Sequence, residues 1–215
     1  MNYKKAYKFL NNSIIDDFSI TRVLSMYSNE TLELISKLKN KLEIRDYICD
    51  INNNEIEKIV LKFKKLDVFI KKDLYNQVLN CTKRYKIIYI IIENDDKRHI
   101  NILLIDNEKK RIERFDTIGQ YVKIMEKITE VIVKKLKLNY EIIHPNKYIF
   151  SSIGLAWPME NRKDCGLCVP LSLLFIYLKI KYDLSLCDII RLFSSYNNKK
   201  LFSISTWFIN YLKSV

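Results

Sequence analysis

Hydrophobic residues recur at helical spacing in several stretches of the chain. Over residues 30–42 the apolar positions fall three or four residues apart, which predicts an amphipathic helix. The pattern is stronger over 120–136, where a single apolar stripe runs from Val122 to Leu136. Residues 55–65 fit a helix and a strand equally well. Further helices are expected at 73–81, 168–181, 185–195 and 203–213.

The pattern changes near residue 83, where strands are expected instead. Residues 85–93 (YKIIYIIIE) are β-branched, aromatic and almost continuously apolar, which is typical of a central buried strand. Residues 98–106 and 111–116 follow after short polar turns, so the three segments predict an antiparallel meander. A short strand is also expected at 140–144, before a loop over 145–164.

These patterns together predict an α+β protein with a central, mainly antiparallel sheet flanked by helices. The change of pattern divides the chain into a mostly helical N-terminal extension, residues 1–82, and a second domain, residues 83–215. Nearly half of the residues, 48%, are hydrophobic, so a chain of this length can bury a substantial core.

The charge and the cysteines limit the classes of partner and the cellular compartment that we expect. A net charge of +12 favours a polyanionic partner such as nucleic acid, although lysines spread over a solvated surface explain it too. The chain shows neither a signal peptide nor an apolar run of membrane-spanning length, so no membrane span is expected. Its five cysteines are an odd number, and we expect free thiols in a reducing compartment, the cytoplasm or the nucleus.

Two residues in the predicted meander can form a catalytic pair. His99 opens one strand and Asp116 ends the next, and a hairpin places these two positions side by side. A carboxylate beside an imidazole can hold the ring in the orientation that a general base needs. The competing interpretation is that Asp116 only stabilises the turn that follows it. His144, the other histidine, precedes Pro145 at the end of a weaker strand.

A nucleophile that fits this pair lies where a loop enters the apolar helix at 168–181. A helix N-terminus and a nearby imidazolium both lower the pKa of a thiol, which activates it. Two cysteines qualify, Cys165 and Cys168. Pro170 favours Cys168, because proline is tolerated in a first helical turn and disrupts a helix interior.

The order of these features resembles a known clan, the ubiquitin-like-protein-specific cysteine proteases, which includes SUMO-type proteases, adenovirus-type proteinases and cysteine proteases of large DNA viruses. The resemblance covers about residues 83–195 and is carried by 99–103, 113–116 and 165–179. It implies a papain-like arrangement with residues in the order His, Asp, Cys, no cofactor or metal, and a cysteine peptidase domain at 83–215. The implied substrate is a ubiquitin-like modifier or a viral structural precursor, and a viral protein would act in the host cytoplasm or the virion.

The resemblance assigns the nucleophile in two ways. Asp164-Cys165-Gly166 looks like the Asp-Cys-Gly of SUMO-type proteases, whereas Gly166-Leu167-Cys168 looks like the helix start of the large-DNA-virus subgroup. Many members carry a tryptophan after the histidine, where this chain has Ile100. They also carry a glutamine for the oxyanion before the cysteine, and Asn161 is the residue that can replace it here, with Glu160 as the second choice.

Three alternatives remain open. A catalytically impaired member of the same fold can act as a basic module that binds protein or nucleic acid, as the replaced tryptophan and glutamine suggest. Cys165 and Cys168 form a C-x-x-C motif, which also occurs in thiol–disulfide oxidoreductases. The same two cysteines can contribute to a zinc site, with His144 and Cys187 as the remaining ligands.

Overall fold

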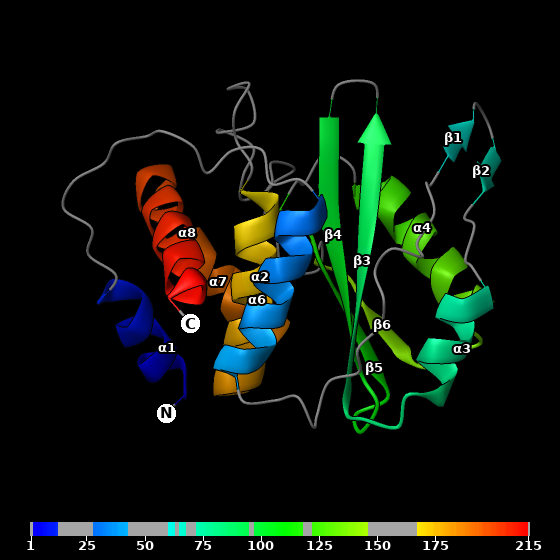
Figure 1. Ribbon diagram of the computed structural model, residues 1–215, viewed down its shortest axis with the longest axis horizontal. Coiled ribbons are helices and arrows are strands. Elements are labelled where there is room, and N and C mark those ends of the chain that lie inside the picture. Colours follow the sequence, from blue (N-terminus) through cyan, green and yellow to red (C-terminus); the bar gives the residue numbers. More distant parts are fainter. Residues whose placement is uncertain are drawn as a thin grey trace. The chain divides into compact units, whose positions relative to one another are not determined.

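The computed structural model describes residues 2–12, 28–42, 60–62, 65–67, 72–94, 97–117, 122–145 and 167–214. Within these residues the helices are α1 (Asn2–Asn11), α2 (Ser28–Lys41), α3 (Lys72–Asn80), α4 (Val122–Lys135), α6 (Cys168–Tyr182), α7 (Leu186–Ser194) and α8 (Asn198–Lys213) (Figure 1). The strands are β1 (Val60–Lys62), β2 (Lys65–Asp67), β3 (Tyr85–Asn94), β4 (Lys97–Asp106), β5 (Arg111–Phe115) and β6 (Glu141–Ile143).

The chain forms two compact units, each built from segments that are distant in the sequence. The helical unit comprises Met1–Ile44, Thr117–Gln120 and Tyr148–Val215, and therefore contains α1, α2, α6, α7 and α8. The sheet unit comprises Arg45–Asp116 and Tyr121–Lys147, and contains the strands together with α3 and α4. The functional division expected at residue 82 stays a prediction.

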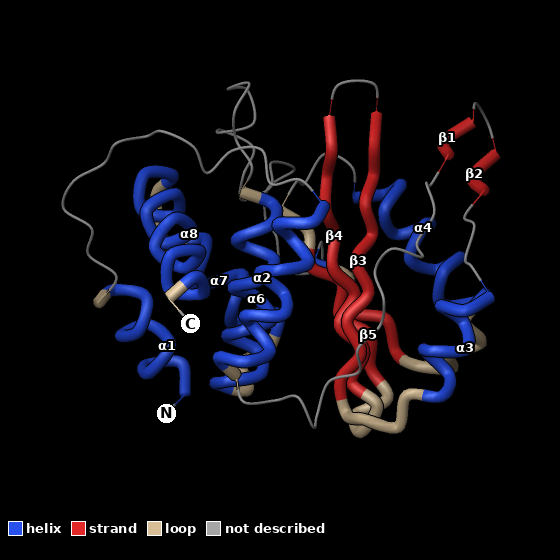
Figure 2. Tube along the Cα trace, viewed as in Figure 1, coloured by secondary structure: helices blue, strands red, loops and turns tan. Residues whose placement is uncertain are grey.

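The sheet unit is built on four strands in the order β3-β4-β5-β6, so β3, which was expected at the centre of the sheet, lies at an edge of it. Figure 2 shows β3 and β4 as two long neighbouring strands. The first three are antiparallel neighbours, whereas β6 pairs in parallel with β5. Leucine and isoleucine side chains of the sheet form a core with α3 and α4, because the apolar stripes of both helices face it. The members of this core are Val78, Leu103, Ile105, Ile112, Ile128, Ile132, Val133 and Leu136.

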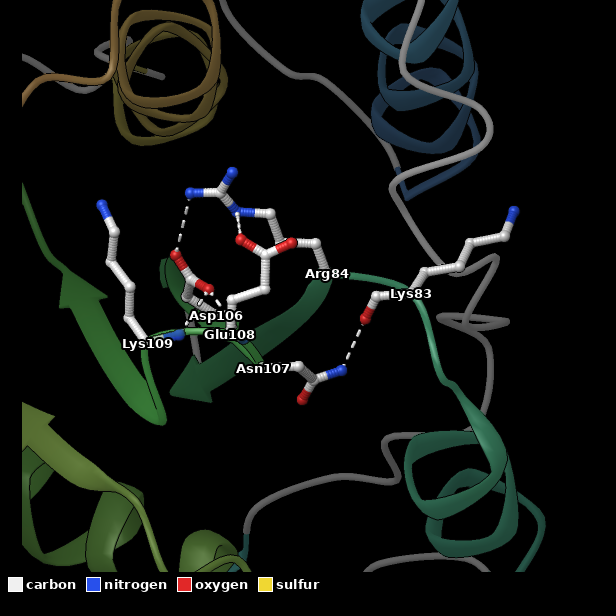
Figure 3. A network of polar contacts seen from close by, with 6 residues as sticks. All are labelled: Lys83, Arg84, Asp106, Asn107, Glu108 and Lys109. Atoms are coloured by element: carbon white, nitrogen blue, oxygen red, sulfur yellow. Dashed lines mark hydrogen bonds and ion pairs between the residues drawn. The ribbon is translucent and has the colours of Figure 1, made fainter.

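A polar network fixes the turn between β4 and β5 (Figure 3). One carboxylate oxygen of Asp106 accepts hydrogen bonds from the backbone N–H groups of Glu108 and Lys109, each at 3.0 Å. Arg84 lies 3.1 Å from the carboxylate of Glu108, and the Asn107 amide donates to the carbonyl of Lys83. These contacts tie the start of β3 to the β4–β5 turn, and so fix the register that the active-site candidates depend on.

The helical unit is organised around α6, whose residues from Val169 to Lys179 are all buried. Aromatic rings of α1, α6 and α8 pack on one another. Phe9 stacks on Tyr177, and it meets Trp207 edge-on with 4.9 Å between the ring centroids. The hydroxyls of Tyr177 and Tyr211 lie 3.2 Å apart. Burial, together with this neighbouring hydroxyl, raises the pKa of Tyr177. This packing holds the second half of α6 against α1 and α8.

The predicted elements agree with the structure over most of the described residues. The α+β class and the mainly antiparallel sheet are confirmed, and the order His, Asp, Cys within a papain-like arrangement stays a prediction. The expected strands at 85–93, 98–106 and 111–116 are β3, β4 and β5, within a residue or two at each end. The ambiguous segment 55–65 contains strand β1, which pairs with β2 in a small hairpin.

Two expectations need correction or completion. Cys168 and Cys187 are free, but Cys81 is disulfide-bonded to a partner outside the described residues, so the expectation of free thiols was wrong for Cys81. Helix α1 was not predicted by itself, since its short apolar stripe of Ala6 and Leu10 is diluted by lysines and tyrosines. Of the helices described, none has the length and apolar character that crossing a membrane requires.

Candidate active-site residues

His99 lies in β4, where its Cα pairs with that of Ile92 in β3. Two residues further along the same strand is Asn101, which is fully buried. In a β-strand, positions two apart belong to the same face of the sheet. The backbone therefore places position 99 in one row with Asn101 and Leu103. This row begins near the first residue of β4.

Asp116 directly follows the last residue of β5, as expected from the sequence. Its side chain is 1% exposed and forms an ion pair with Arg114, whose side chain has no exposed surface. Arg114 Nη1 donates to Asp116 Oδ2 at 2.7 Å and to Asn101 Oδ1 at 3.1 Å. Because Leu103 pairs with Arg114 in the sheet register, these three polar side chains belong to the row that contains position 99.

The electrostatics of this cluster are those of a buried ion pair. Burial lowers the pKa of Arg114, and the charge and hydrogen bond of Asp116 act in the opposite direction, as does the charge of Glu126 in α4. Arginine nevertheless stays protonated in proteins, so the guanidinium is a fixed positive charge. Asp116 therefore lies beside a permanent cation that favours its ionised form.

Cys168 is the first residue of α6, so the helix starts where Pro170 indicated. Pro170 falls in the first turn, where a missing N–H breaks no helical hydrogen bond. The first bond of the helix runs from the Leu171 N–H to the Leu167 carbonyl at 3.1 Å. The side chain of Leu167 makes no capping hydrogen bond, so it does not offset the partial positive charge at this end of the helix. The thiol of Cys168 is free and partly exposed.

The predicted site residues fall in different parts of the structure. Asp116 and the backbone of His99 belong to the sheet unit, whereas Cys168 belongs to the helical unit. Cys165 and Asn161 lie outside the described residues. The meeting of thiol, imidazole and carboxylate therefore stays a prediction. In the part of the chain that the structure describes, no three His, Cys, Asp or Glu side chains gather as a metal site would require.

Sequence reasoning missed Arg114, the ion-pair partner of Asp116, and Asn101, which accepts from the same guanidinium nitrogen. Asn101 and Arg114 are polar residues inside strands whose neighbouring positions are buried and mostly apolar. Their two-residue spacing from His99 and Asp116 was the available signal, because it puts four polar positions in one row of a sheet.

Comparisons with known proteins give a fold and no family. No family model and no curated protein matches the chain. Among solved structures, the Chlamydia trachomatis effector protein ChlaDUB1 matches with a TM-score of 0.51 at 9% identity, over 99% of this chain and 88% of that one. The SUMO protease Ulp1, with its catalytic cysteine oxidised to a sulfenic acid, gives a TM-score of 0.40 at 11% identity, over 98% and 95% of the two chains.

Only the first of these similarities is strong enough to indicate a shared fold. At 9% identity it carries no residue-by-residue assignment. The chain is thus similar in fold to ChlaDUB1.

Proposed function

We propose that the chain is a cysteine peptidase with Cys168 as nucleophile, His99 as general base and Asp116 as the residue that orients the imidazole. Its substrate is a peptide or isopeptide bond of a ubiquitin-like modifier or of a structural precursor. The observation that carries the proposal is the free, partly exposed thiol at the first residue of a buried helix, in a chain with this fold.

The chemistry follows from the residue types. His99 takes the thiol proton, and the thiolate attacks the carbonyl carbon of the substrate. The imidazolium then gives that proton to the leaving amine, the C–N bond breaks, and a thioester between Cys168 and the acyl group remains. A water molecule, deprotonated by His99, attacks the thioester and releases the thiol and the carboxylic acid. Asn161 and backbone N–H groups stabilise the oxyanion that forms during acylation and again during hydrolysis of the thioester.

The start of α6 supports Cys168 over Cys165 as the nucleophile. The N-terminal end of a helix favours negative charge, and the thiolate is the reactive form of cysteine. The buried body of α6 also holds this position rigid, which a nucleophile requires for repeated attack in one geometry. Cys187, which is also free and partly exposed, lies in α7 near Arg191 and has no place in the proposal.

The proposal is tested with ubiquitin and SUMO substrates that release a C-terminal fluorophore, and with a peptide library that covers precursor cleavage. Cys168→Ala, His99→Ala and Asp116→Asn are compared with the matched control Cys187→Ala. We expect Cys168→Ala and His99→Ala to abolish turnover, Asp116→Asn to lower kcat by about 10²-fold or more, and Cys187→Ala to keep it.

Two outcomes contradict the proposal. Full turnover by Cys168→Ala excludes this cysteine, and loss of turnover in Cys165→Ala alone moves the nucleophile to Cys165. If the wild-type chain cleaves none of the substrates and no suicide probe derived from them labels it, the catalytically impaired alternative replaces the proposal.

A further inference from the structure

We infer that Arg114 is a positioning residue, which holds the Asp116 carboxylate ionised and in place while Asn101 fixes the same guanidinium nitrogen. The inference rests on the proposed function, in which Asp116 orients the imidazole of His99. It adds a residue that neither the sequence pattern nor the fold comparison assigns.

The geometry of the cluster is that of a fixed clamp. A single nitrogen, Arg114 Nη1, donates to Asp116 Oδ2 at 2.7 Å and to Asn101 Oδ1 at 3.1 Å. The side chains of Arg114 and Asp116 are 0% and 1% exposed, and Asn101 is 0% exposed. Water therefore does not compete for these hydrogen bonds, and the side chains come from adjacent strands whose register is set. A group that must orient an imidazole needs such a fixed position.

The charge of Arg114 gives the clamp a second role. Burial raises the pKa of a carboxyl group by disfavouring its charged form, and an adjacent cation reverses this effect. Asp116 is buried, so without Arg114 its carboxylate would lose the neighbour that favours ionisation. The other charged group that acts on Arg114 is Glu126 of α4, and its negative charge also favours the charged guanidinium. Both neighbours keep the cation beside Asp116.

Arg114 bonds one oxygen of the Asp116 carboxylate, Oδ2. An ionised carboxylate has about four lone-pair sites and can therefore accept from several donors at once. Position 99 shares its row of the sheet with Asn101, Arg114 and Asp116. Arg114 also contacts Asp116 through one nitrogen and shares that nitrogen with Asn101.

The same strand provides a matched control. Arg111 is also an arginine of β5 with a carboxylate partner, Glu141, at 3.1 Å. Its side chain is 39% exposed and that of Glu141 is 60% exposed, so the charge of this pair is screened by water. Replacing Arg111 removes one arginine from β5 without touching the buried cluster.

The experiment measures the rate at which iodoacetamide alkylates Cys168 as a function of pH, with Cys187 of the same molecule as the internal reference. Peptide mapping by mass spectrometry separates the two thiols. In the wild type, Cys168 is expected to react faster than in His99→Ala, because the imidazole takes the proton of its thiol. Arg114→Gln leaves Asp116 to protonate more readily, so the imidazolium is less stable and the acid limb of Cys168 moves to higher pH.

The expected shift is about one pH unit, which corresponds to about a tenfold lower alkylation rate on the acid limb. Arg114→Lys keeps the charge and should restore most of the wild-type profile, and Arg111→Gln should leave it unchanged. In an Asp116→Asn background, Arg114→Gln should cause no further shift, because Arg114 acts through Asp116.

Three results decide the inference. A wild-type profile in Arg114→Gln overturns it, as does an equal shift in Arg114→Lys. If Arg114→Gln does not fold, as judged by circular dichroism, Asn101→Leu replaces it: this variant removes the acceptor that fixes Nη1 without adding a charge, and an unchanged acid limb again overturns the inference. If His99→Ala leaves the alkylation of Cys168 as it is in the wild type, the proposed function fails instead, whatever the Arg114 variants show.

Discussion

At the scale of single residues, the structure buries charged side chains, one of which is the catalytic candidate Asp116. Charged side chains are rarely buried unless they are paired. Arg114, Asp116 and Lys86 are all 5% exposed or less. The first two neutralise each other at 2.7 Å. Removing the charge should change the free energy of unfolding in opposite directions for the paired Arg114 and for Lys86, and both changes can be measured.

Removing Arg114 should destabilise the fold. Arg114→Met leaves the carboxylate of Asp116 buried without its cation, and we expect the free energy of unfolding to fall by about 3–5 kcal/mol. Urea denaturation measures it, with Arg111→Met as the control, for which a change of at most about 1 kcal/mol is expected because that pair is exposed. A loss of similar size in both variants would show that burial of the pair has no energetic consequence.

Replacing Lys86 should have the opposite effect. Burial, with a smaller contribution from the charge of Lys110, lowers the pKa of Lys86. Between its folded and unfolded pKa values the unfolded chain binds more protons, so stability should rise as pH rises toward the ordinary lysine value. Lys86→Met should remove this dependence and stabilise the protein by about 1 kcal/mol or more.

Thermal unfolding between pH 7 and pH 10 tests this expectation. The control is Lys127→Met, which replaces an exposed lysine of α4 and should change little. If Lys86→Met lowers the melting temperature at every pH, the charged group of Lys86 contributes to stability and the account of its burial is wrong.

At the scale of elements, the sequence was informative where the local pattern and the final packing agree. The apolar run over 85–93 predicted a strand, and β3 is one, but it lies at an edge of the four-stranded sheet and not at its centre. The stripe of α4 predicted the face that packs on the sheet. Pro170 placed the start of α6 at Cys168 for a local steric reason. Such signals need only the residues of one element.

What the sequence did not predict depends on contacts between elements. The β1–β2 hairpin has strands of three residues, too short for alternation to be read. The hydrogen bond of Arg114 to Asn101 joins residues thirteen positions apart and requires the β4–β5 register. The parallel pairing of β6 with β5 likewise follows from the path of α4 between them and not from the residues of β6.

The helix that begins at Cys168 makes a prediction at this scale. Proline in the first turn breaks no hydrogen bond, so Pro170→Ala should change the free energy of unfolding by no more than about 1 kcal/mol. Leu174→Pro places the same residue in the buried interior, and should cost about 3 kcal/mol or more. Chemical denaturation of both variants measures the difference. Equal effects would show that α6 does not begin at Cys168.

At the scale of the whole molecule, the active-site hypothesis joins residues from both compact units. The chain passes from the helical unit to the sheet unit and back more than once, so neither unit contains a complete set of catalytic candidates. The net charge of +12 belongs to this scale too, since it describes the surface as a whole and identifies no partner by itself. The central claim is therefore that the imidazole of His99 and the thiol of Cys168 interact.

The most direct test is an NMR pH titration of the histidine ring protons, which is simple because the chain has two histidines. A thiolate next to an imidazolium raises the pKa of the ring. We predict that the pKa of His99 lies above the ordinary value of about 6.5 in the wild type and falls toward it in Cys168→Ala, while Cys187→Ala leaves it unchanged. An identical His99 titration in the wild type and in Cys168→Ala would contradict the account.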